Sequence, residues 1–221
     1  MFKEIPDLLT PEEIAELRAI AARAPFVDGK ISNPHSRVKN NLQLHDAALS
    51  QQASRIVAKA MYSHDDFLAF AFPVNIAPPL VTRYQPGMTY GAHADAAFLQ
   101  IGQTSLRSDL SATVFLNDPE AYGGGALRIT LGTRELAFKG PAGSAIVYPS
   151  NMLHHVEPVQ SGERLVAITF IQSRIADATN RMALYELNDI TAMEGRKMDW
   201  ENFTRLQLVQ QHLLRLWGET S

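Results

Sequence analysis

The sequence contains no cysteine among its 221 residues. Disulfide bonds, iron–sulfur clusters and zinc sites with thiolate ligands all require cysteine, so the sequence excludes them. A protein without disulfide bonds fits the reducing environment of the cytoplasm, where we expect this one to work. A metal site in this chain would therefore have to use ligands other than thiolate.

Long apolar runs and clusters of basic residues are also missing. No run of 18 apolar residues occurs, so we expect no membrane-spanning helix. The N-terminal residues Met1 to Asp7 have neither the charged start nor the apolar stretch of a signal peptide. The net charge is −3 and no basic run exceeds the pair Arg196-Lys197, so we expect no binding to nucleic acid.

With 46% hydrophobic and 19% charged residues, the composition is that of an ordinary globular protein. The length fits one domain with appendages. Near the N-terminus, Thr10-Pro11-Glu12-Glu13 predicts a helix start, because Thr10 and Glu13 form a capping box and Pro11 suits the first helical position. We expect that helix to end before Pro25, and a second helix over residues 46–62.

From Phe70 onward the pattern changes to short apolar runs separated by turn residues. We expect strands over 70–84, 110–117, 126–131, 134–139, 144–149, 153–158 and 164–172. Many short strands with regular turns predict an antiparallel barrel or a double-sheet jelly roll.

The tail from Ile175 returns to a helical pattern. Leu206, Val209, Leu213, Leu216 and Trp217 form an apolar stripe, which predicts a helix packed against the barrel. Such a stripe would also suit packing against a second copy of the chain, so a homo-oligomer is a further prediction. The fold class is therefore α+β with a mainly β core. We expect an N-terminal helical region (1–74), a jelly-roll core (75–174) and a C-terminal helical extension (175–221).

An imidazole and a carboxylate stand two residues apart in His93-Ala94-Asp95. In an extended backbone, residues i and i+2 point to the same face, so both side chains can approach one ion. His154 lies further along the chain, on another β-like segment. Two imidazoles and one carboxylate, with open positions on the metal, form the ligand set of non-haem Fe(II) oxygenases.

A basic residue, Arg164, begins the last apolar run. Alternation places it on one face with Val166, Ile168 and Phe170, where an arginine is costly without an anion. We expect 153–158 and 164–170 to form a hairpin in which Arg164 pairs near Val159. His154 would then lie about 16 Å away along the strand. A five-carbon diacid could span that distance from the metal to the guanidinium.

Each of these residues alone has an ordinary structural interpretation. His93 could be a satisfied histidine, Asp95 a turn residue, and His154 and His155 are neighbours of equal type. A second His-x-Asp pair, His64 to Asp66, has no comparable partners, and we interpret it as surface. His35, His45 and His212 receive the same interpretation. The combination in the order His93, Asp95, His154, Arg164 is what indicates a site.

This order resembles the Fe(II)- and 2-oxoglutarate-dependent dioxygenases of the prolyl 4-hydroxylase-like type, and more narrowly the bacterial PKHD-type hydroxylases. The resemblance covers nearly the whole chain. Further segments that carry it are Val38-Lys39-Asn40-Asn41, Arg83-Tyr84, Pro86-Gly87-Met88, Asp109 to Leu116, Tyr122-Gly123-Gly124, Tyr148-Pro149-Ser150, Leu153-His154 and the region of Trp217.

The resemblance implies a double-stranded β-helix with the metal at its mouth. It implies Fe(II) on His93, Asp95 and His154, with His154 preferred over His155 by its spacing to Arg164. Arg164 would hold the C5 carboxylate of 2-oxoglutarate, and Tyr84 would contact that cosubstrate unless it is only a packing aromatic. O2 and an unidentified primary substrate are the other implied partners, and L-ascorbate the implied reductant.

Two other functions remain open from the residues alone. One is a non-catalytic jelly-roll protein that binds a metal or small anion as a sensor. The other is a metal-using isomerase, although that would normally have more ligands and no arginine for a diacid. The segment 96–109 is long enough to form a lid on the substrate side, and we expect its Arg107 to meet solvent or an acidic residue.

Overall fold

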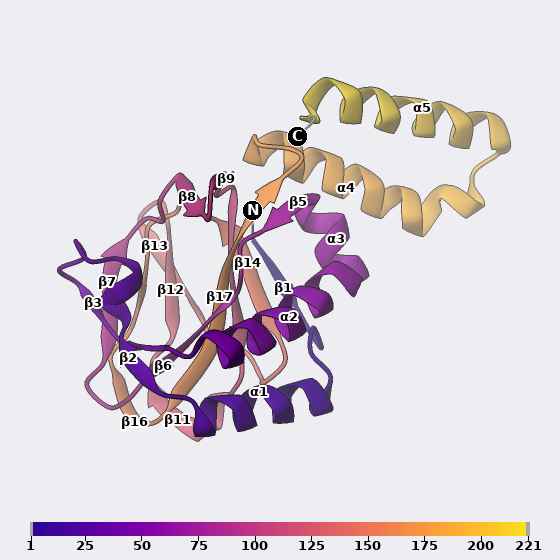
Figure 1. Ribbon diagram of the computed structural model, residues 1–221. Coiled ribbons are helices and arrows are strands. Elements are labelled where there is room, and N and C mark those ends of the chain that lie inside the picture. The colour runs from indigo at the N-terminus through magenta and orange to yellow at the C-terminus, as the bar shows by residue number, and fades with distance from the viewer. Residues whose placement is uncertain (1, 220–221) are drawn as a thin grey trace.

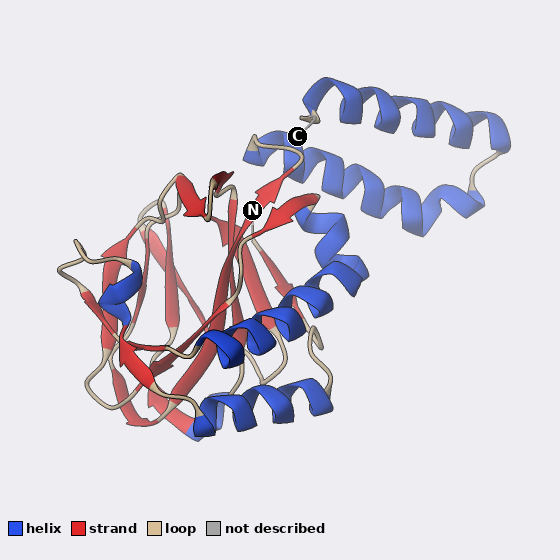
Figure 2. Cartoon of the chain, in the orientation of Figure 1, coloured by secondary structure: helices blue, strands red, loops and turns tan. Residues whose placement is uncertain are grey.

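The computed structural model describes residues 2–219. Two antiparallel sheets face each other, and helices cover one side of the pair (Figures 1 and 2). This is the α+β arrangement with a jelly-roll core that the sequence predicts.

The larger sheet forms the centre of the molecule. Its β17 lies between β10 and β6, and β5 pairs with the far end of β17. In spatial order its main strands are β1 (Lys3–Ile5), β14 (Ala145–Pro149), β10 (Leu110–Phe115), β17 (Arg164–Ser173), β6 (Leu80–Tyr84), β4 (Leu42–Leu44) and β2 (Phe26–Asp28), with β5 at Pro73–Ile76.

The smaller sheet lies opposite. Its five strands are, in order, β13 (Arg134–Phe138), β12 (Leu127–Leu131), β15 (His154–Val156), β7 (Thr89–His93) and β3 (Lys39–Asn40). Two further pairs lie at the ends of the sandwich: β11 (Tyr122–Gly124) with β16 (Val159–Gly162), and β8 (Phe98–Ile101) with β9 (Thr104–Arg107).

Alternation along β17 divides the core into two layers. Leu165, Ala167 and Ile171 face the helices, whereas Val166 and Ile168 face the smaller sheet, where they pack with residues such as Ile129. Arg164 has the parity of the second set, as its place in the sequence predicts. The larger sheet is thus buried on both faces.

Three helices cover the outer face of the larger sheet: α1 (Pro11–Arg23), α2 (Ala47–Ser63) and α3 (Asp65–Ala71). The predicted capping box of α1 is confirmed, because Thr10 Oγ1 accepts the amide of Glu13 and the Glu13 carboxylate accepts the amide of Thr10. At α2 a single hydrogen bond forms the cap, because the Asp46 side chain accepts the amide of Leu49. Three short 3₁₀ turns complete the elements: η1 (Gly29–Ser32), η2 (Pro119–Ala121) and η3 (Gly195–Lys197).

The tail forms two helices, α4 (Ala178–Glu194) and α5 (Trp200–Trp217), which run side by side beyond α3 (Figure 1). The prediction that the tail stripe packs against the barrel is wrong: α5 packs along α4, and none of its residues is buried. Gln210 bonds Asn188 and Thr191 of α4 instead. The partner is thus the neighbouring helix in sequence, which the stripe alone could not reveal.

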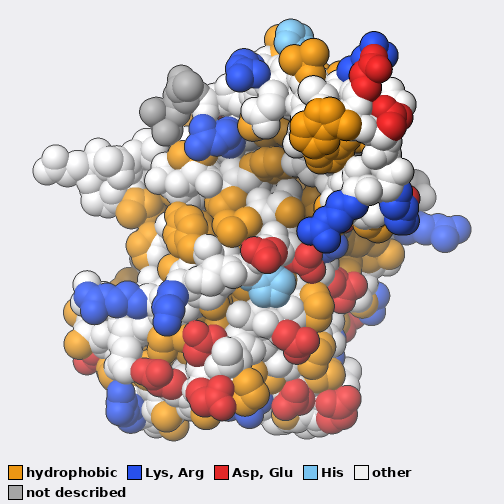
Figure 3. All heavy atoms as spheres, turned by 90° about the vertical axis from the view of Figure 1, so that its right-hand side faces the viewer, with side chains coloured by type: hydrophobic (Ala, Val, Ile, Leu, Met, Phe, Trp, Pro, Cys, Tyr) orange, Lys and Arg blue, Asp and Glu red, His pale blue; other side chains and the backbone are white. Residues whose placement is uncertain are grey.

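Apolar side chains remain exposed on this helical pair. Figure 3 shows the face of the molecule on which α4 and α5 lie, where hydrophobic side chains are interspersed with charged ones. The exposed large apolar side chains of the tail are Ile190, Met193, Met198, Trp200, Leu208, Val209 and Leu216. No helix among the described residues has the length and apolar character to cross a membrane.

Two more expectations need correction. The run 70–84 is not one strand: α3 ends at Ala71, and Pro78 and Pro79, which cannot both join a ladder, separate β5 from β6. The predicted hairpin of 153–158 with 164–170 is also wrong. Arg164 pairs with Tyr84, while Val159 pairs with Gly124. The chain crosses from the smaller to the larger sheet between these runs. The intervening strand β16 belongs to neither sheet and pairs with the glycine-rich β11.

Candidate active site

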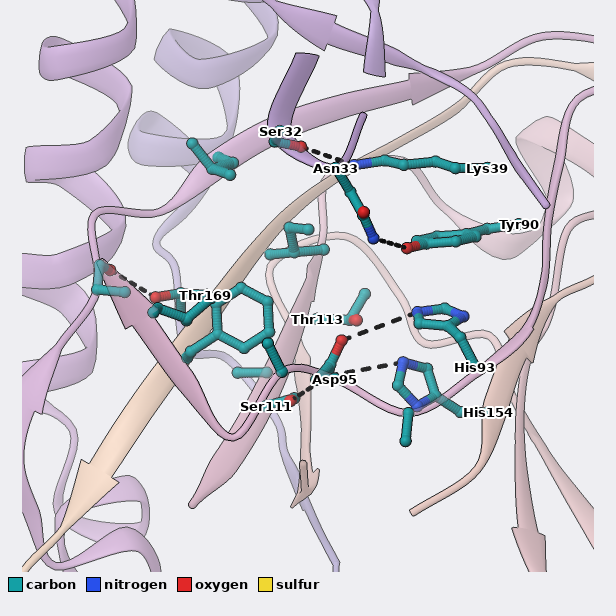
Figure 4. Close-up of a pocket in the computed structure, with 18 of the residues that line it drawn as sticks. Ser32, Asn33, Lys39, Tyr90, His93, Asp95, Ser111, Thr113, His154 and Thr169 are labelled. Atoms are coloured by element: carbon teal, nitrogen blue, oxygen red, sulfur yellow. Dashed lines mark hydrogen bonds and ion pairs between the residues drawn. The ribbon is translucent and has the colours of Figure 1, made fainter. Parts of the chain in front are cut away.

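A cavity of about 600 Å³ lies between the two sheets. Both sheets contribute polar side chains to it, and the hairpin of β8 and β9 contributes Leu99 and Ile101 (Figure 4). A volume of this size is typical of a small-molecule site. His93, Asp95, His154, Arg164 and Tyr84 all line this one cavity, so the structure brings together every site residue predicted from the sequence.

The two histidines lie opposite each other on neighbouring strands. His93 of β7 pairs in register with His154 of β15, and their ring centroids are 4.3 Å apart. Nδ1 of His93 lies 2.8 Å from the carbonyl oxygen of Gly91, and Nδ1 of His154 lies 2.9 Å from that of Met152. A carbonyl only accepts, so both Nδ1 atoms carry the proton and both Nε2 atoms keep a free lone pair.

Those lone pairs lie next to the carboxylate of Asp95. Nε2 of His93 is 3.8 Å from Oδ1 of Asp95, and Nε2 of His154 is 3.6 Å from Oδ2 (Figure 4). The three side chains offer ligand atoms that all lie within 4.8 Å of one another. The donor set and its spacing therefore fit a divalent metal bound by two imidazoles and one carboxylate, the set preferred by non-haem Fe(II).

The larger sheet holds Asp95 in place, although β7 ends at His93. The amide of Asp95 donates to the carbonyl of Ser150, and Ser111 Oγ of β10 donates to Oδ2 of Asp95 at 2.5 Å. Ser111 also contacts Ser150 Oγ at 2.8 Å. Outer partners of this kind orient a ligating carboxylate. Asp95 is therefore positioned by hydrogen bonds from the opposite sheet rather than by strand geometry.

Electrostatics favour the neutral imidazole at His93. Burial, and then the adjacent His154, lower the pKa of His93 below its ordinary value. Tyr90 stacks on the same ring with centroids 3.7 Å apart. Only neutral imidazole binds a metal. Because its pKa is lowered, His93 can stay neutral, and so able to bind a metal, at a lower pH than a free histidine.

The remaining candidates from the sequence lie elsewhere. His155 is on the opposite face of β15, where Nδ1 lies 3.7 Å from Glu135. His64 caps the turn between α2 and α3 and its Nε2 lies 3.2 Å from the carbonyl oxygen of Pro6. The geometry thus favours His154 over His155.

Arg164 is one of the most deeply buried side chains, at 1% exposure. No ion pair among the described residues includes it, and its Nε has no hydrogen-bond partner. Its guanidinium lies 4.9 Å from the ring centre of Tyr84, and the glycine conformation at Gly125 (φ +65°) leaves room for its side chain. A buried guanidinium of this kind fits a carboxylate of a bound diacid.

The segment 96–109 is largely a hairpin, not a loop, and its β8 strand lines the cavity. As expected, Arg107 meets an acidic residue: it pairs with Asp109 at 2.7 Å and with Glu219. Sequence reasoning missed three other cavity residues, Lys39, Tyr90 and Ser111. Lys39 and Ser111 lie in segments that carry the family resemblance, but sequence reasoning assigned them no role, because only the pairing of strands brings them to the proposed metal ligands.

Comparison with known proteins decides the family. A profile described as the 2OG-Fe(II) oxygenase superfamily matches residues 79–172. A PKHD-type hydroxylase of Sphingopyxis alaskensis is 58% identical over 217 residues, which cover 98% of this chain and 99% of that protein. The chain belongs to the PKHD-type hydroxylases. As such it is a 2-oxoglutarate-dependent dioxygenase, and the sensor and isomerase alternatives lose their basis.

Solved structures agree on the fold of this hydroxylase. A prolyl-4-hydroxylase of Pseudomonas putida superposes with a TM-score of 0.53 at 20% identity, covering 78% of this chain and 92% of that one. HygX of Streptomyces hygroscopicus, solved with nickel, 2-oxoglutarate and hygromycin B bound, superposes with a TM-score of 0.53 at 16% identity, covering 76% and 81%. The predicted jelly-roll core of a 2-oxoglutarate oxygenase is confirmed.

Proposed function

We propose that this hydroxylase binds Fe(II) through His93, Asp95 and His154 and the C5 carboxylate of 2-oxoglutarate through Arg164. The observation that carries the proposal is the buried, unpaired guanidinium in the same cavity as three convergent metal-ligand side chains. The nickel and 2-oxoglutarate bound together in HygX support it by analogy. Tyr84, against which Arg164 packs, is proposed as a second contact to the cosubstrate.

The charges balance in this arrangement. Asp95 leaves one positive charge on a divalent iron, the 2-oxoglutarate dianion reverses that sign, and Arg164 restores neutrality. A balance of this kind suits a buried site, where uncompensated charge is costly. Iron and 2-oxoglutarate, when bound, supply the activation of O2 and yield succinate and CO2 as the substrate is hydroxylated.

The protein's own residues bind and orient these groups. The backbone carbonyls at residues 91 and 152 fix which nitrogen of each imidazole is free, and Ser111 holds the carboxylate. The larger sheet buries Arg164 so that the diacid is desolvated at its far end. The hairpin of β8 and β9 lines the cavity through residues of β8, and we propose that it acts as a lid on the substrate side.

Other parts of the assignment remain predictions. Residues 75–174 would form the catalytic core, between a helical region (1–74) and a helical extension (175–221). A cytoplasmic location and the use of ascorbate as reductant rest on composition and family resemblance. A homo-oligomer would use the exposed apolar side chains of α4 and α5.

The test compares a buried arginine with a partly exposed one. Arg164→Met removes the cosubstrate anchor, whereas Arg128→Met removes a half-exposed arginine that pairs with Glu157 on the smaller sheet. In the presence of Fe(II), we expect the wild type and Arg128→Met to form succinate from 2-oxoglutarate in an O2-dependent reaction. In Arg164→Met the apparent KM for 2-oxoglutarate should rise by more than about tenfold, because a charged hydrogen-bonded partner is lost.

Metal binding, measured by calorimetry with Mn(II), should persist in Arg164→Met. If Arg164→Met consumes 2-oxoglutarate as the wild type does, the role assigned to this arginine is wrong.

A further inference from the structure

A second buried cation, Lys39, lines the same cavity. It lies on β3 at the edge of the smaller sheet, in register with Tyr90, and only 5% of it is exposed. Its Nζ donates to Ser32 Oγ at 2.7 Å and lies 5.5 Å from the ring centre of Tyr90 (Figure 4). A lysine at a sheet edge normally extends its ammonium into water, so this placement requires a reason.

No carboxylate pairs with Lys39. It takes part in none of the ion pairs between residues 2 and 219. Burial lowers its pKa, and the charges of Asp28 and Asp95 only partly oppose that change. A buried charge without a partner is costly, and a ligand that brings the opposite charge removes the cost.

The cosubstrate does not supply that charge. In the proposed site, Asp95, a divalent iron, 2-oxoglutarate and Arg164 are neutral together, so none of these groups balances the Lys39 ammonium. Arg164 and Lys39 also lie on different sheets. In the close-up, Lys39 and Ser32 lie on the side away from His154, with Asn33 and Tyr90 between them and the metal ligands (Figure 4).

Polar side chains lie on the side of the cavity that holds this ammonium, and apolar side chains form much of the remaining cavity wall. Ser32 carries a hydroxyl, and the side-chain amide of Asn33 contacts the Tyr90 hydroxyl at 3.4 Å. The apolar lining is contributed by Pro78, Leu80, Leu99, Ile101, Ile168 and Phe170. A molecule that satisfies both parts has an anionic end and an apolar body.

We propose that Lys39, with Ser32 and Asn33, binds an anionic group of the primary substrate, so that the apolar part of that substrate lies beside the metal. The substrate is therefore a small carboxylate or comparable oxyanion with an aliphatic or aromatic body. This inference rests on the proposed function, since it takes Asp95 and Arg164 as occupied by metal and cosubstrate.

The experiment uses the full-length protein loaded with Mn(II) and saturating N-oxalylglycine, which fills the 2-oxoglutarate position and stops turnover. The probes are aliphatic and aromatic carboxylic acids of four to nine carbon atoms, each matched with its own primary amide. Relaxation of the probe's protons by Mn(II), followed by NMR, reports both binding and closeness to the metal. Phosphate monoesters with the same bodies form a further arm that separates carboxylate from phosphate recognition.

We expect acids to bind the wild type more tightly than their amides by more than about tenfold. Lys39→Met should remove that preference, Lys39→Arg should keep most of it, and Lys197→Met, at an exposed lysine paired with Glu194, should leave it unchanged. Equal binding of acids and amides to the wild type, or no acid relaxed by the metal, would overturn the inference. So would an unchanged preference in Lys39→Met.

Failure of this inference is distinguishable from failure of the proposed function. Binding of N-oxalylglycine to the Mn(II)-loaded protein is measured first, in the wild type and in each variant. If the wild type does not bind it, the proposed function has failed. If binding is normal but acids show no dependence on Lys39, only the anion subsite is wrong. Should Lys39→Met not fold, Lys39→Arg and the comparison of acids with amides on the wild type still decide.

Discussion

The two sheets carry different parts of the site and are buried to different degrees. Every residue of β10 in the larger sheet is buried, and helices α1 to α3 cover that sheet's outer face. In β12 of the smaller sheet, buried residues alternate with half-exposed ones. The larger sheet therefore forms the centre of the fold and carries Arg164 and Ser111. The smaller sheet carries Lys39 and the two histidines that we propose as metal ligands. Substitutions in the two sheets should have different consequences.

The largest expected effect separates the two faces of β15. His154→Ala removes a proposed ligand from the cavity side and should abolish tight binding of Fe(II) or Mn(II). His155→Ala, on the outer face next to Glu135, should bind metal like the wild type. Calorimetric titration with Mn(II) under matched conditions measures both, and a loss of binding only in His155→Ala would move the ligand to that residue.

The next effect compares the same substitution in the two sheets. Leu165→Ala creates a cavity between β17 and the helices and should lower the free energy of unfolding by about 2–5 kcal/mol. Leu131→Ala, at the end of β12 with 41% of the leucine exposed, should change it by less than about 0.5 kcal/mol. Urea unfolding followed by circular dichroism measures both. Equal losses would show that the smaller sheet is as tightly packed at its edge as the larger one at its centre.

A smaller effect is expected at Ser111 of the larger sheet, which supports Asp95, the residue just after β7 of the smaller sheet. Ser111→Ala removes the hydroxyl that donates to Asp95, and metal affinity should fall by about 10–100-fold without loss of fold. Ser105→Ala, at an exposed serine of β9, is the control. An unchanged affinity in Ser111→Ala would mean that the amide bond of Asp95 to Ser150 is sufficient to orient the carboxylate.

The smallest effect concerns pH. Protons compete with metal for imidazole, and burial lowers the pKa of His93 below about 6.5. Metal affinity should therefore fall only as the pH drops below about 6.5, where His93 becomes protonated. A fall in Mn(II) affinity that begins above pH 7 would contradict the environment described for His93.

Local patterns predicted much of the local structure and singled out residues that the fold brings to one cavity. The capping box of Thr10 and Glu13 predicted the start of α1, and alternation along β17 predicted which face of the sheet carries Arg164. Long-range pairing was not predictable, because it depends on which sheet a strand joins. For this reason the expected pairing of Arg164 with Val159 was wrong. The segment around Lys39 carries part of the family resemblance, but its sequence did not indicate that β3 would bring it beside the proposed metal ligands.

In the tail, too, the sequence predicted the local structure but not the packing partner. Its apolar stripe correctly indicated a helix, but a stripe carries no information about its partner, and α4 rather than the barrel fills that role. The hairpin at 96–109 was also missed as regular structure, although its distance from the metal pair in sequence suggested its position at the cavity.

One measurement tests the central claim most directly: a crystal structure of the protein with Mn(II) and N-oxalylglycine. We expect one metal held by Nε2 of His93, Nε2 of His154 and the carboxylate of Asp95, with the far carboxylate of N-oxalylglycine on the Arg164 guanidinium. The bound molecule would thus join the two sheets. A metal bound without His154, or an Arg164 that contacts no carboxylate, would contradict this account.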